Sequence, residues 1–192
     1  MKTFQDLQEG VYDPNILKAF FLAGGPGSGK SYVVKRGTGG LGLKIVNSDD
    51  AFEKYIKDAG LSMKMPKSEE EPREILRQRS KVITKKKLDN YVEGRLGLII
   101  DGTGKEYDKI AKQATGLKQL GYDVHMIFVN TSLETALKRN AKRDRTVPRS
   151  IATKSWKTVQ SNMGKFSQYF RQNFIVVDNN DSEEDVMGPV YK

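Results

Sequence analysis

The residues with the clearest chemical potential stand in the stretch GGPGSGKS, from Gly24 to Ser31. Its spacing matches the pattern G-x-x-x-x-G-K-[S/T], in which backbone amides of a glycine-rich loop surround phosphate groups. A lysine at this position reaches the β- and γ-phosphates of a nucleotide, and the hydroxyl that follows it ligates Mg²⁺. We therefore expect a nucleotide site formed by Gly25, Pro26, Gly27, Ser28, Gly29, Lys30 and Ser31.

The residues on both sides of this loop support that interpretation. An apolar run at residues 19–23 predicts a short buried strand before the loop, and residues 30–36 contain no helix breaker. A helix that begins inside the loop would add the partial positive charge of its amino end. The alternative, a flexible turn with a coincidental Lys-Ser pair, does not require these flanks. We also expect the Lys30 side chain to face solvent in the empty site.

Carboxylates follow two later apolar runs. Asp49 and Asp50 follow the second predicted strand, and Asp101 follows the third. A carboxylate beside the terminal phosphate accepts the proton of an attacking hydroxyl, so we expect Asp49 or Asp50 to act as a general base. Asp101 would hold Mg²⁺ together with Ser31, and each acid also has a simpler interpretation as a helix cap. The predicted acceptor side comprises Asp49, Asp50, Asp101 and Thr103.

A basic segment, residues 138–150, would complete the site as a lid. It contains six basic residues and one acidic residue. Arg139 and Arg143 are four residues apart on a predicted helix and would share a face, whereas Arg145 and Arg149 fall in the predicted loop beyond it. An arginine that closes over a transferring phosphoryl group stabilises its charge. The same composition also suits a patch that binds nucleic acid, or an ordinary solvated surface.

Composition narrows the classes of protein further. The chain has 192 residues, which suits one domain over residues 1–192. The absence of cysteine excludes disulfides and thiolate metal sites, and a single histidine argues against a multi-histidine metal site. No apolar run approaches the ~18 residues of a membrane span, so we expect a cytoplasmic protein with no membrane partner. A net charge of +9, from 33 basic and 24 acidic residues, favours anionic partners, including nucleic acid.

The predicted elements place these residues along one edge of a sheet. Strands alternate with helices, which indicates a parallel sheet that helices cover on both faces. Ligands of such sheets bind at the carboxyl ends of the strands, where the loop and the acids stand. A short helix is expected over residues 14–18, and an acceptor-side helical insertion over residues 51–94. In its long helix we expect one roughly apolar face, opposite a solvated side that carries three consecutive lysines, and the residues of that face are Ile75, Leu76, Val82 and Ile83.

Four segments together resemble P-loop kinases of the bacteriophage polynucleotide kinase and zeta-toxin type. They are GGPGSGKS, VNSDDAFEKY, LIIDGTG and LKRNAKRDRTVP, and the resemblance covers residues 20–148. It implies an α/β P-loop NTPase fold with a five-stranded parallel sheet in the order 2-3-1-4-5. It also implies that Asp49 is the general base, that Arg143 is the transition-state arginine, and that Arg139 lies on the nucleotide side.

The chain departs from the polynucleotide kinases at one position. They carry an arginine three residues after the base, which grips a phosphate of the acceptor, whereas this chain has Phe52. The zeta-toxin type, which phosphorylates a sugar nucleotide, also has a bulky residue there. The resemblance thus implies an ATP- and Mg²⁺-dependent kinase whose hydroxyl acceptor is a nucleic-acid end, a nucleotide or a sugar nucleotide. The rival hypothesis is a non-catalytic or weakly hydrolytic nucleotide-binding protein that holds nucleic acid through its basic lid and has no need of Asp49.

Overall fold

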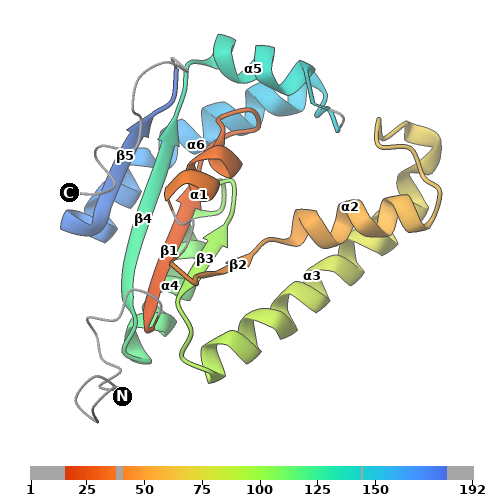
Figure 1. The fold of residues 1–192 in the computed structure, drawn as a ribbon. Helices are drawn as coiled ribbons and strands as arrows, with labels where there is room; N and C mark the ends of the chain where they lie inside the picture. Colours follow the sequence, from red (N-terminus) through yellow and green to blue (C-terminus); the bar gives the residue numbers. More distant parts are fainter. Residues whose placement is uncertain (1–15, 38–40, 144, 181–192) are drawn as a thin grey trace.

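The computed structural model describes residues 16–37, 41–143 and 145–180, and a five-stranded sheet forms its centre (Figure 1). All neighbouring strands are parallel, in the order β2-β3-β1-β4-β5, which confirms the predicted order. Residues 14 and 15 of the helix predicted over residues 14–18 lie outside the described residues, and the prediction is wrong for the rest, because Ile16 forms a β-bridge with Leu96 and Lys18 begins a strand. The strands are β1 (Lys18–Ala23), β2 (Lys44–Val46), β3 (Leu98–Asp101), β4 (Asp123–Asn130) and β5 (Phe174–Asp178).

Helices occupy the connections between the strands, as the alternating pattern predicts. No helix in the described part of the chain is both long and apolar enough to cross a membrane. The α-helices of the described residues are α1 (Lys30–Gly37), α2 (Ser48–Asp58), α3 (Glu70–Glu93), α4 (Tyr107–Gln119), α5 (Leu133–Ala141) and α6 (Arg149–Phe170). Two short 3-10 helices, η2 (Lys67–Glu69) and η3 (Arg171–Asn173), precede α3 and β5.

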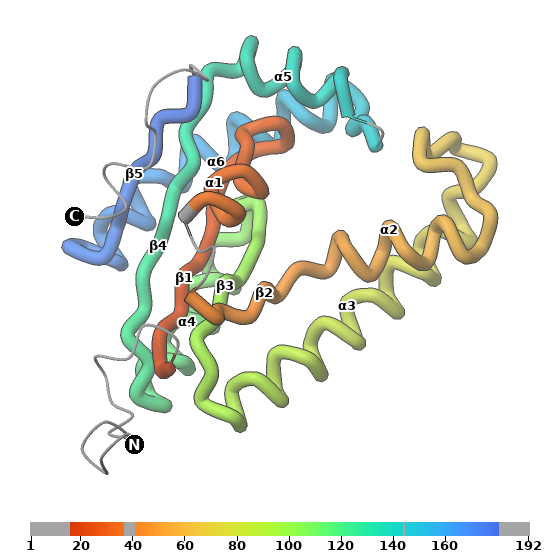
Figure 2. Tube along the Cα trace, viewed as in Figure 1, coloured from red at the N-terminus to blue at the C-terminus, as the bar shows by residue number. Residues whose placement is uncertain are grey.

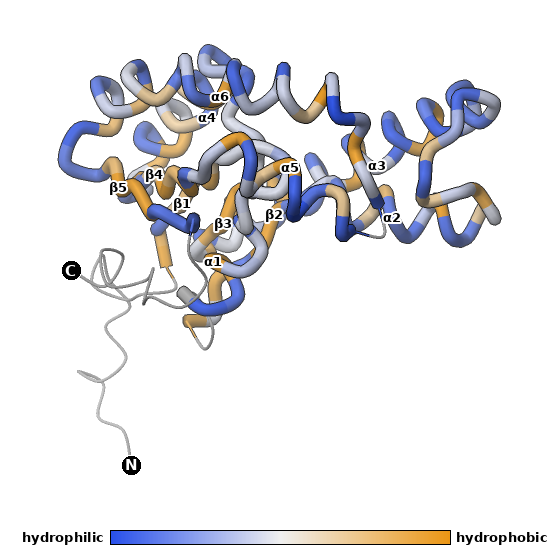
Figure 3. Tube along the Cα trace, turned by 90° about the horizontal axis from the view of Figure 1, so that it is seen from above, coloured by the Kyte–Doolittle hydropathy of each residue, from blue (hydrophilic) through white to orange (hydrophobic). Residues whose placement is uncertain are grey.

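The sheet buries both of its faces, because alternate side chains of a strand point to opposite sides. Phe21 of β1 packs in one cluster with Leu117 of α4 and Phe166 of α6. Leu22, the next residue, packs in a second cluster with Val33 of α1. Figure 3 shows these strands as a hydrophobic centre, with the more polar α2 and α3 to one side. The core therefore lies on both faces of the sheet, between the strands and the helices that cover them.

The carboxyl ends of the three strands on the α2 side of the sheet meet at one edge. Leu22 of β1 pairs in register with Asp101 of β3, and Ile100 pairs with Val46 of β2. The chain therefore leaves β1 into the phosphate loop, leaves β2 into α2, and ends β3 at Asp101, all at the same level. This register brings together groups that are far apart in the sequence.

The helical insertion forms a hairpin of α2 and α3 that extends away from the sheet (Figures 1 and 2). Phe52 and Ile56 of α2 are buried, whereas Ile75, Val82 and Ile83 of α3 are 67%, 56% and 42% exposed. Three residues of the apolar face predicted for the long helix are therefore exposed to solvent rather than covered. Leu88, Tyr91 and Val92, near the end of α3, pack against the core beside the sheet, whereas the part of α3 that projects beyond the sheet is covered on the side that meets α2. The apolar pattern of α3 does not coincide with that side.

Candidate active site

The phosphate loop connects the carboxyl end of β1 to the amino end of α1. Gly27 and Gly29 adopt positive φ angles of 83° and 89°, a region that favours glycine. A Cβ on Gly27 would lie 2.0 Å from the carbonyl oxygen of Ala136, and a Cβ on Gly29 would lie 2.1 Å from the side-chain nitrogen of Asn179. Both conformation and space therefore require glycine here. The resulting loop presents backbone amides to an anion at the start of α1.

Two segments that follow other strands hold this loop in place. The amide of Gly24 donates to the carbonyl of Thr103, after β3, at 3.0 Å. The side-chain amide of Asn179, after β5, donates to the carbonyl of Ser28 at 2.8 Å. Thr103 therefore supports the phosphate loop through its backbone, in addition to its predicted place on the acceptor side.

The first residues of the loop pack against α6. Gly25 is buried, and a Cβ on it would lie 3.4 Å from the Cα of Trp156. The indole of Trp156 donates to the carbonyl of Thr131 at 2.9 Å, which fixes the ring behind the loop. Gly25 and Pro26, which we predicted to bind the nucleotide, do not line the cavity described below. Gly25 instead sets the position of the loop.

Lys30 begins α1 and turns its amine back over the loop. Its Nζ donates to the carbonyl of Gly24 at 2.7 Å, and the side chain is half-buried. The expectation that it faces solvent is therefore wrong. Burial lowers the pKa of this amine, although the charge of Asp101 acts in the opposite direction. A phosphate oxygen that replaces the carbonyl would offer the ammonium group a charged partner.

Asn47, at the end of β2, organises the acceptor side. Its Oδ1 accepts the amide of Asp49 at 2.8 Å and caps α2, which begins earlier than predicted. Its Nδ2 donates to Asp101 at 3.0 Å and to Asp50 at 3.4 Å. Asp49 and Asp50 thus belong to the first turn of α2. Asn47, rather than either acid, is the cap.

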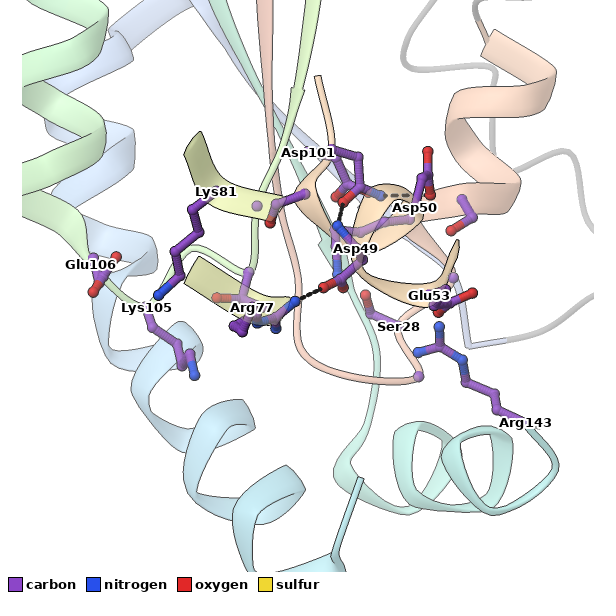
Figure 4. Close-up of a pocket in the computed structure, with 18 of the residues that line it drawn as sticks. Ser28, Asp49, Asp50, Glu53, Arg77, Lys81, Asp101, Lys105, Glu106 and Arg143 are labelled. Carbon is purple, nitrogen blue, oxygen red and sulfur yellow. Dashed lines mark hydrogen bonds and ion pairs between the residues drawn. The ribbon is translucent and has the colours of Figure 1, made fainter. Parts of the chain in front are cut away.

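The Asp49 carboxylate pairs with two arginines, one on each oxygen (Figure 4 shows the Arg77 pair). Nη1 of Arg77, from α3, lies 2.6 Å from Oδ1, and Nη2 of Arg145 lies 2.9 Å from Oδ2. Burial raises the pKa of Asp49, but hydrogen bonds and charge from Arg145 and Arg77 outweigh burial and bring it to about 2. The carboxylate is therefore ionised at neutral pH, with charge-assisted hydrogen bonds on both oxygens.

Asp101 and Ser31 are the residues that could hold a metal ion. Burial raises the pKa of Asp101, and the charge of Lys30 offsets only part of this effect. A buried carboxyl group with incomplete charge compensation suits a divalent cation, and hydroxyl and carboxylate oxygens suit Mg²⁺. Within residues 16–37, 41–143 and 145–180, no group of three or more His, Cys, Asp or Glu could hold a metal. The phosphates and water would therefore supply most ligands.

One cavity of about 680 Å³ collects these groups (Figure 4). In Figure 4, Asp49, Asp50 and Asp101 lie close together, and Lys81 and Lys105 approach from the opposite side. Predicted site residues that line the cavity are Gly27, Ser28, Gly29, Lys30, Ser31, Asp49, Asp50, Asp101, Thr103, Arg139 and Arg143. The donor and acceptor sides of the predicted reaction therefore share one space.

The predicted lid differs from expectation at both of its ends. The helix before it ends earlier than predicted, and the helix after it begins earlier, at Arg149. Because α5 ends at Ala141, Arg139 lies in the helix and the exposed Arg143 lies beyond it, so the prediction that they share one helix is wrong. Arg139 donates to the carbonyl of Asn179 at 2.6 Å. Arg149 is the first residue of α6 rather than part of a loop.

A pair of hydrogen bonds explains where the chain turns. The side chain of Asn140 donates to the carbonyl of Val147 at 2.7 Å and accepts the amide of Val147 at 3.2 Å. These bonds close the segment between α5 and α6 into a compact turn. Sequence alone gives no sign of this closure, because asparagine near a helix end has several common roles.

The sequence placed Arg145 in the basic lid but identified neither Arg145 nor Arg77 as a partner of Asp49. Arg145 is only 8% exposed, and its Nε lies 3.4 Å from Glu53. Arg77 lies 4.4 Å over the ring of Phe52. The sequence signal for such pairs was Phe52, which stands where polynucleotide kinases carry an arginine. In this chain, positive charge reaches that place from α3 and from the lid instead.

The strand order places the phosphate loop at the centre of the sheet, between β3 and β4, and this arrangement is that of the P-loop kinases. The chain has that fold, as the resemblance implied. Comparison of the sequence with models of protein families identifies the family within this fold. Residues 6–186 match the zeta toxin model, so the chain belongs to the zeta toxin family.

Solved structures share this fold at low sequence identity. A candidate kinase from Chloroflexus aurantiacus matches with a TM-score of 0.65 and 15% identity, over 91% of this chain and 95% of that chain. The AvrRxo1-ORF1:-ORF2 structure with ATP matches with a TM-score of 0.64 and 15% identity, over 87% and 56%. A gluconokinase from Sinorhizobium meliloti matches with a TM-score of 0.52 and 14% identity, over 92% and 89%. No curated protein matches the chain.

Proposed function

We propose that this protein is an ATP- and Mg²⁺-dependent kinase that transfers the γ-phosphoryl group to a hydroxyl. The observation that carries the proposal is the shared cavity, in which Lys30 of the phosphate loop and the ionised Asp49 line the same space. A protein that only binds nucleotide needs the loop but has no use for Asp49. The acceptor is a nucleic-acid end, a nucleotide or a sugar nucleotide.

On the donor side, the loop amides and Lys30 bind the phosphates. Lys30 exchanges the carbonyl of Gly24 for oxygens of the β- and γ-phosphates. Arg139 and Arg143 line the cavity beside the loop and stabilise the charge of the transferring group. Mg²⁺, when bound, neutralises charge between the β- and γ-phosphates, and Ser31 and Asp101 would hold it. The AvrRxo1 structure with ATP supports ATP as the nucleotide of this fold.

On the acceptor side, Asp49 takes the proton of the attacking hydroxyl. The hydroxyl oxygen forms a bond to the γ-phosphorus, the bond to the β–γ bridging oxygen breaks, and ADP leaves. With both arginines in place Asp49 is a weak base, so transfer requires that one of them withdraw. The gluconokinase of the same fold supports an acceptor that carries hydroxyl groups.

The second candidate function is a nucleotide-binding protein that holds nucleic acid and transfers nothing. The net charge of +9 and the exposed Arg143 and Arg149 favour it. Such a protein should bind DNA or RNA without ATP, with an affinity that falls steeply as salt rises. It should also leave every hydroxyl acceptor unlabelled.

A screen of acceptors with γ-labelled ATP and Mg²⁺ tests the proposal. The panel contains 5′-hydroxyl oligonucleotides, nucleosides, nucleotides and sugar nucleotides, and we expect label transfer to one class. Lys30→Ala should abolish the transfer, because the variant loses the donor that contacts the transferring phosphates. The control is Lys35→Ala, which removes an exposed lysine of the same helix and should keep wild-type activity. Equal transfer by wild type and Lys30→Ala would exclude the phosphate-loop mechanism.

A further inference from the structure

We infer that Arg145 is a specificity-determining residue that prevents Asp49 from activating water. In the acceptor-free protein its guanidinium occupies Asp49, and we propose that it leaves only when oxygen atoms of the acceptor replace that carboxylate. The inference rests on the proposed function, because it takes Asp49 as the general base. It assigns to Arg145 a role that differs from those of Arg139 and Arg143.

Ion pairs hold the Arg145 side chain against Asp49, the proposed general base. Its Nη2 lies 2.9 Å from Oδ2 of Asp49, and its Nε lies 3.4 Å from Oε1 of Glu53. Arg77 binds the other oxygen of Asp49 at 2.6 Å. A water molecule in the cavity therefore meets a carboxylate whose two oxygens already accept strong hydrogen bonds.

The same guanidinium is incompletely satisfied. Its side chain is 9% exposed, and its Nη1 and Nε are buried without a hydrogen-bond partner in the described structure. A buried donor without a partner costs free energy, and the cost is larger for a charged group. An acceptor whose oxygens reach Nη1 would recover that cost and draw the guanidinium away from Asp49. The ion pair with Asp49 therefore holds Arg145 in place in the empty site, and a hydrogen bond from Nη1 to an acceptor would favour its movement.

The turn between α5 and α6 connects this contact to the nucleotide side. Arg145 lies inside the turn that Asn140 and Val147 close. Arg139 and Arg143, at the start of the same segment, line the cavity beside the phosphate loop. One short segment thus contributes arginines to both substrates, and Arg145 is the member that contacts the base.

A kinase with a freely basic carboxylate beside ATP would use water as its acceptor. Water would give its proton to Asp49 and attack the γ-phosphorus, and the products would be ADP and inorganic phosphate. Arg145 occupies one oxygen of Asp49 and removes it from that reaction. Loss of Arg145 should therefore increase hydrolysis, whereas loss of a residue with a purely structural role would decrease it.

The test measures phosphate release from ATP and Mg²⁺ without any acceptor. We expect Arg145→Gln to release phosphate about tenfold faster than wild type, which is part of the ~10²–10⁴-fold that a positioned base contributes. Arg145→Lys keeps a positive charge in the buried site but cannot span Asp49 and Glu53, and it should give a smaller rise. It keeps the test decisive if the glutamine variant does not fold. The control, Arg171→Gln, removes an exposed arginine of η3 that does not line the cavity, and it should match wild type.

The double variant Asp49→Asn/Arg145→Gln identifies the route. Its phosphate release should return to the wild-type rate or below, because the added hydrolysis passes through Asp49. An unchanged or lower rate in both Arg145 variants would overturn the inference, and so would a gain that survives in the double variant. If the acceptor screen finds transfer while Arg145→Gln shows no gain, only this inference fails. If no acceptor is labelled and Lys30→Ala changes nothing, the proposed function itself fails.

Discussion

At the scale of single residues, the site depends on which groups contact the Asp49 carboxylate. Arg77 and Arg145 hold it in place and keep it ionised, and Asn47 accepts its backbone amide. Asp50, the next residue, is exposed, and within the described residues its hydrogen bond is the long contact with Asn47 at 3.4 Å. The two adjacent acids, which the sequence could not distinguish, therefore have different surroundings.

Replacing Asp49 tests its role as the base. Asp49→Asn keeps the shape of the side chain but cannot take a proton, so phosphoryl transfer should fall by ~10²–10⁴-fold. Nucleotide affinity should remain, because Asp49 lies on the acceptor side. Steady-state kinetics and a nucleotide titration measure the two quantities. The matched variant Asp50→Asn should keep most activity, and a large loss there instead would move the base to Asp50.

Arg143 offers a second test at the scale of one side chain. Arg143→Lys keeps the charge but loses the planar fork that contacts two phosphate oxygens at once. If Arg143 acts on the transition state, kcat and kcat/KM should fall together, with little change in ATP affinity. If it only attracts nucleic acid, lysine should replace it almost fully, since long-range attraction depends on charge. The measurement is steady-state kinetics of this variant, and near-normal kcat would contradict the catalytic role.

At the scale of elements, local patterns predicted the sheet and the phosphate loop well. The spacing of its glycines identifies the phosphate loop, and apolar runs identify strands that are buried on both faces. The side of α3 that is buried could not be predicted, because Ile75, Val82 and Ile83 would be covered only if the sheet extended beneath them. The partners of Asp49 were not predictable either, because Arg77 and Arg145 lie 28 and 96 residues away and no local spacing encodes such pairs.

The phosphate loop allows a test of backbone geometry. Gly27→Ala places a methyl group 2.0 Å from the carbonyl of Ala136 and forces a positive φ on alanine. We expect nucleotide binding to be lost and Tm to fall. The comparison variant is Gly116→Ala in α4, where a Cβ meets nothing within 4 Å and φ is ordinary. It should stabilise the protein by about 0.5–1 kcal/mol, as alanine does in helices. Thermal melts and nucleotide titrations of the two variants measure both effects.

At the scale of the whole molecule, the ion pairs of Asp49 join three separate parts. Asp49 belongs to α2, Arg77 to α3, and Arg145 to the turn between α5 and α6. The α2–α3 hairpin otherwise extends away from the sheet (Figure 1). The carboxylate therefore links the hairpin to the opposite side of the cavity, and protonation of this one group should loosen that link.

The pH dependence of stability tests this link. The pKa of Asp49 falls from 3.8 to about 2 on folding, so its contribution is complete above about pH 4 and is lost as the pH falls towards 2. We expect Tm of the wild type to drop between pH 7 and pH 3. The drop should be smaller in Asp49→Asn, because that side chain does not titrate. Equal drops in the two proteins, measured by thermal melts across pH, would show that Asp49 is not linked to folding in this way.

The packing of Trp156 against the phosphate loop has an optical consequence. It is the only tryptophan of the 192 residues, so all indole emission of the protein comes from one known place. That place is the backbone of Gly25, with the indole N–H fixed on the carbonyl of Thr131. A change in the loop alters the surroundings of the ring directly. The protein therefore contains its own fluorescent reporter of the phosphate loop, and a nucleotide titration needs neither a dye nor a labelled ligand.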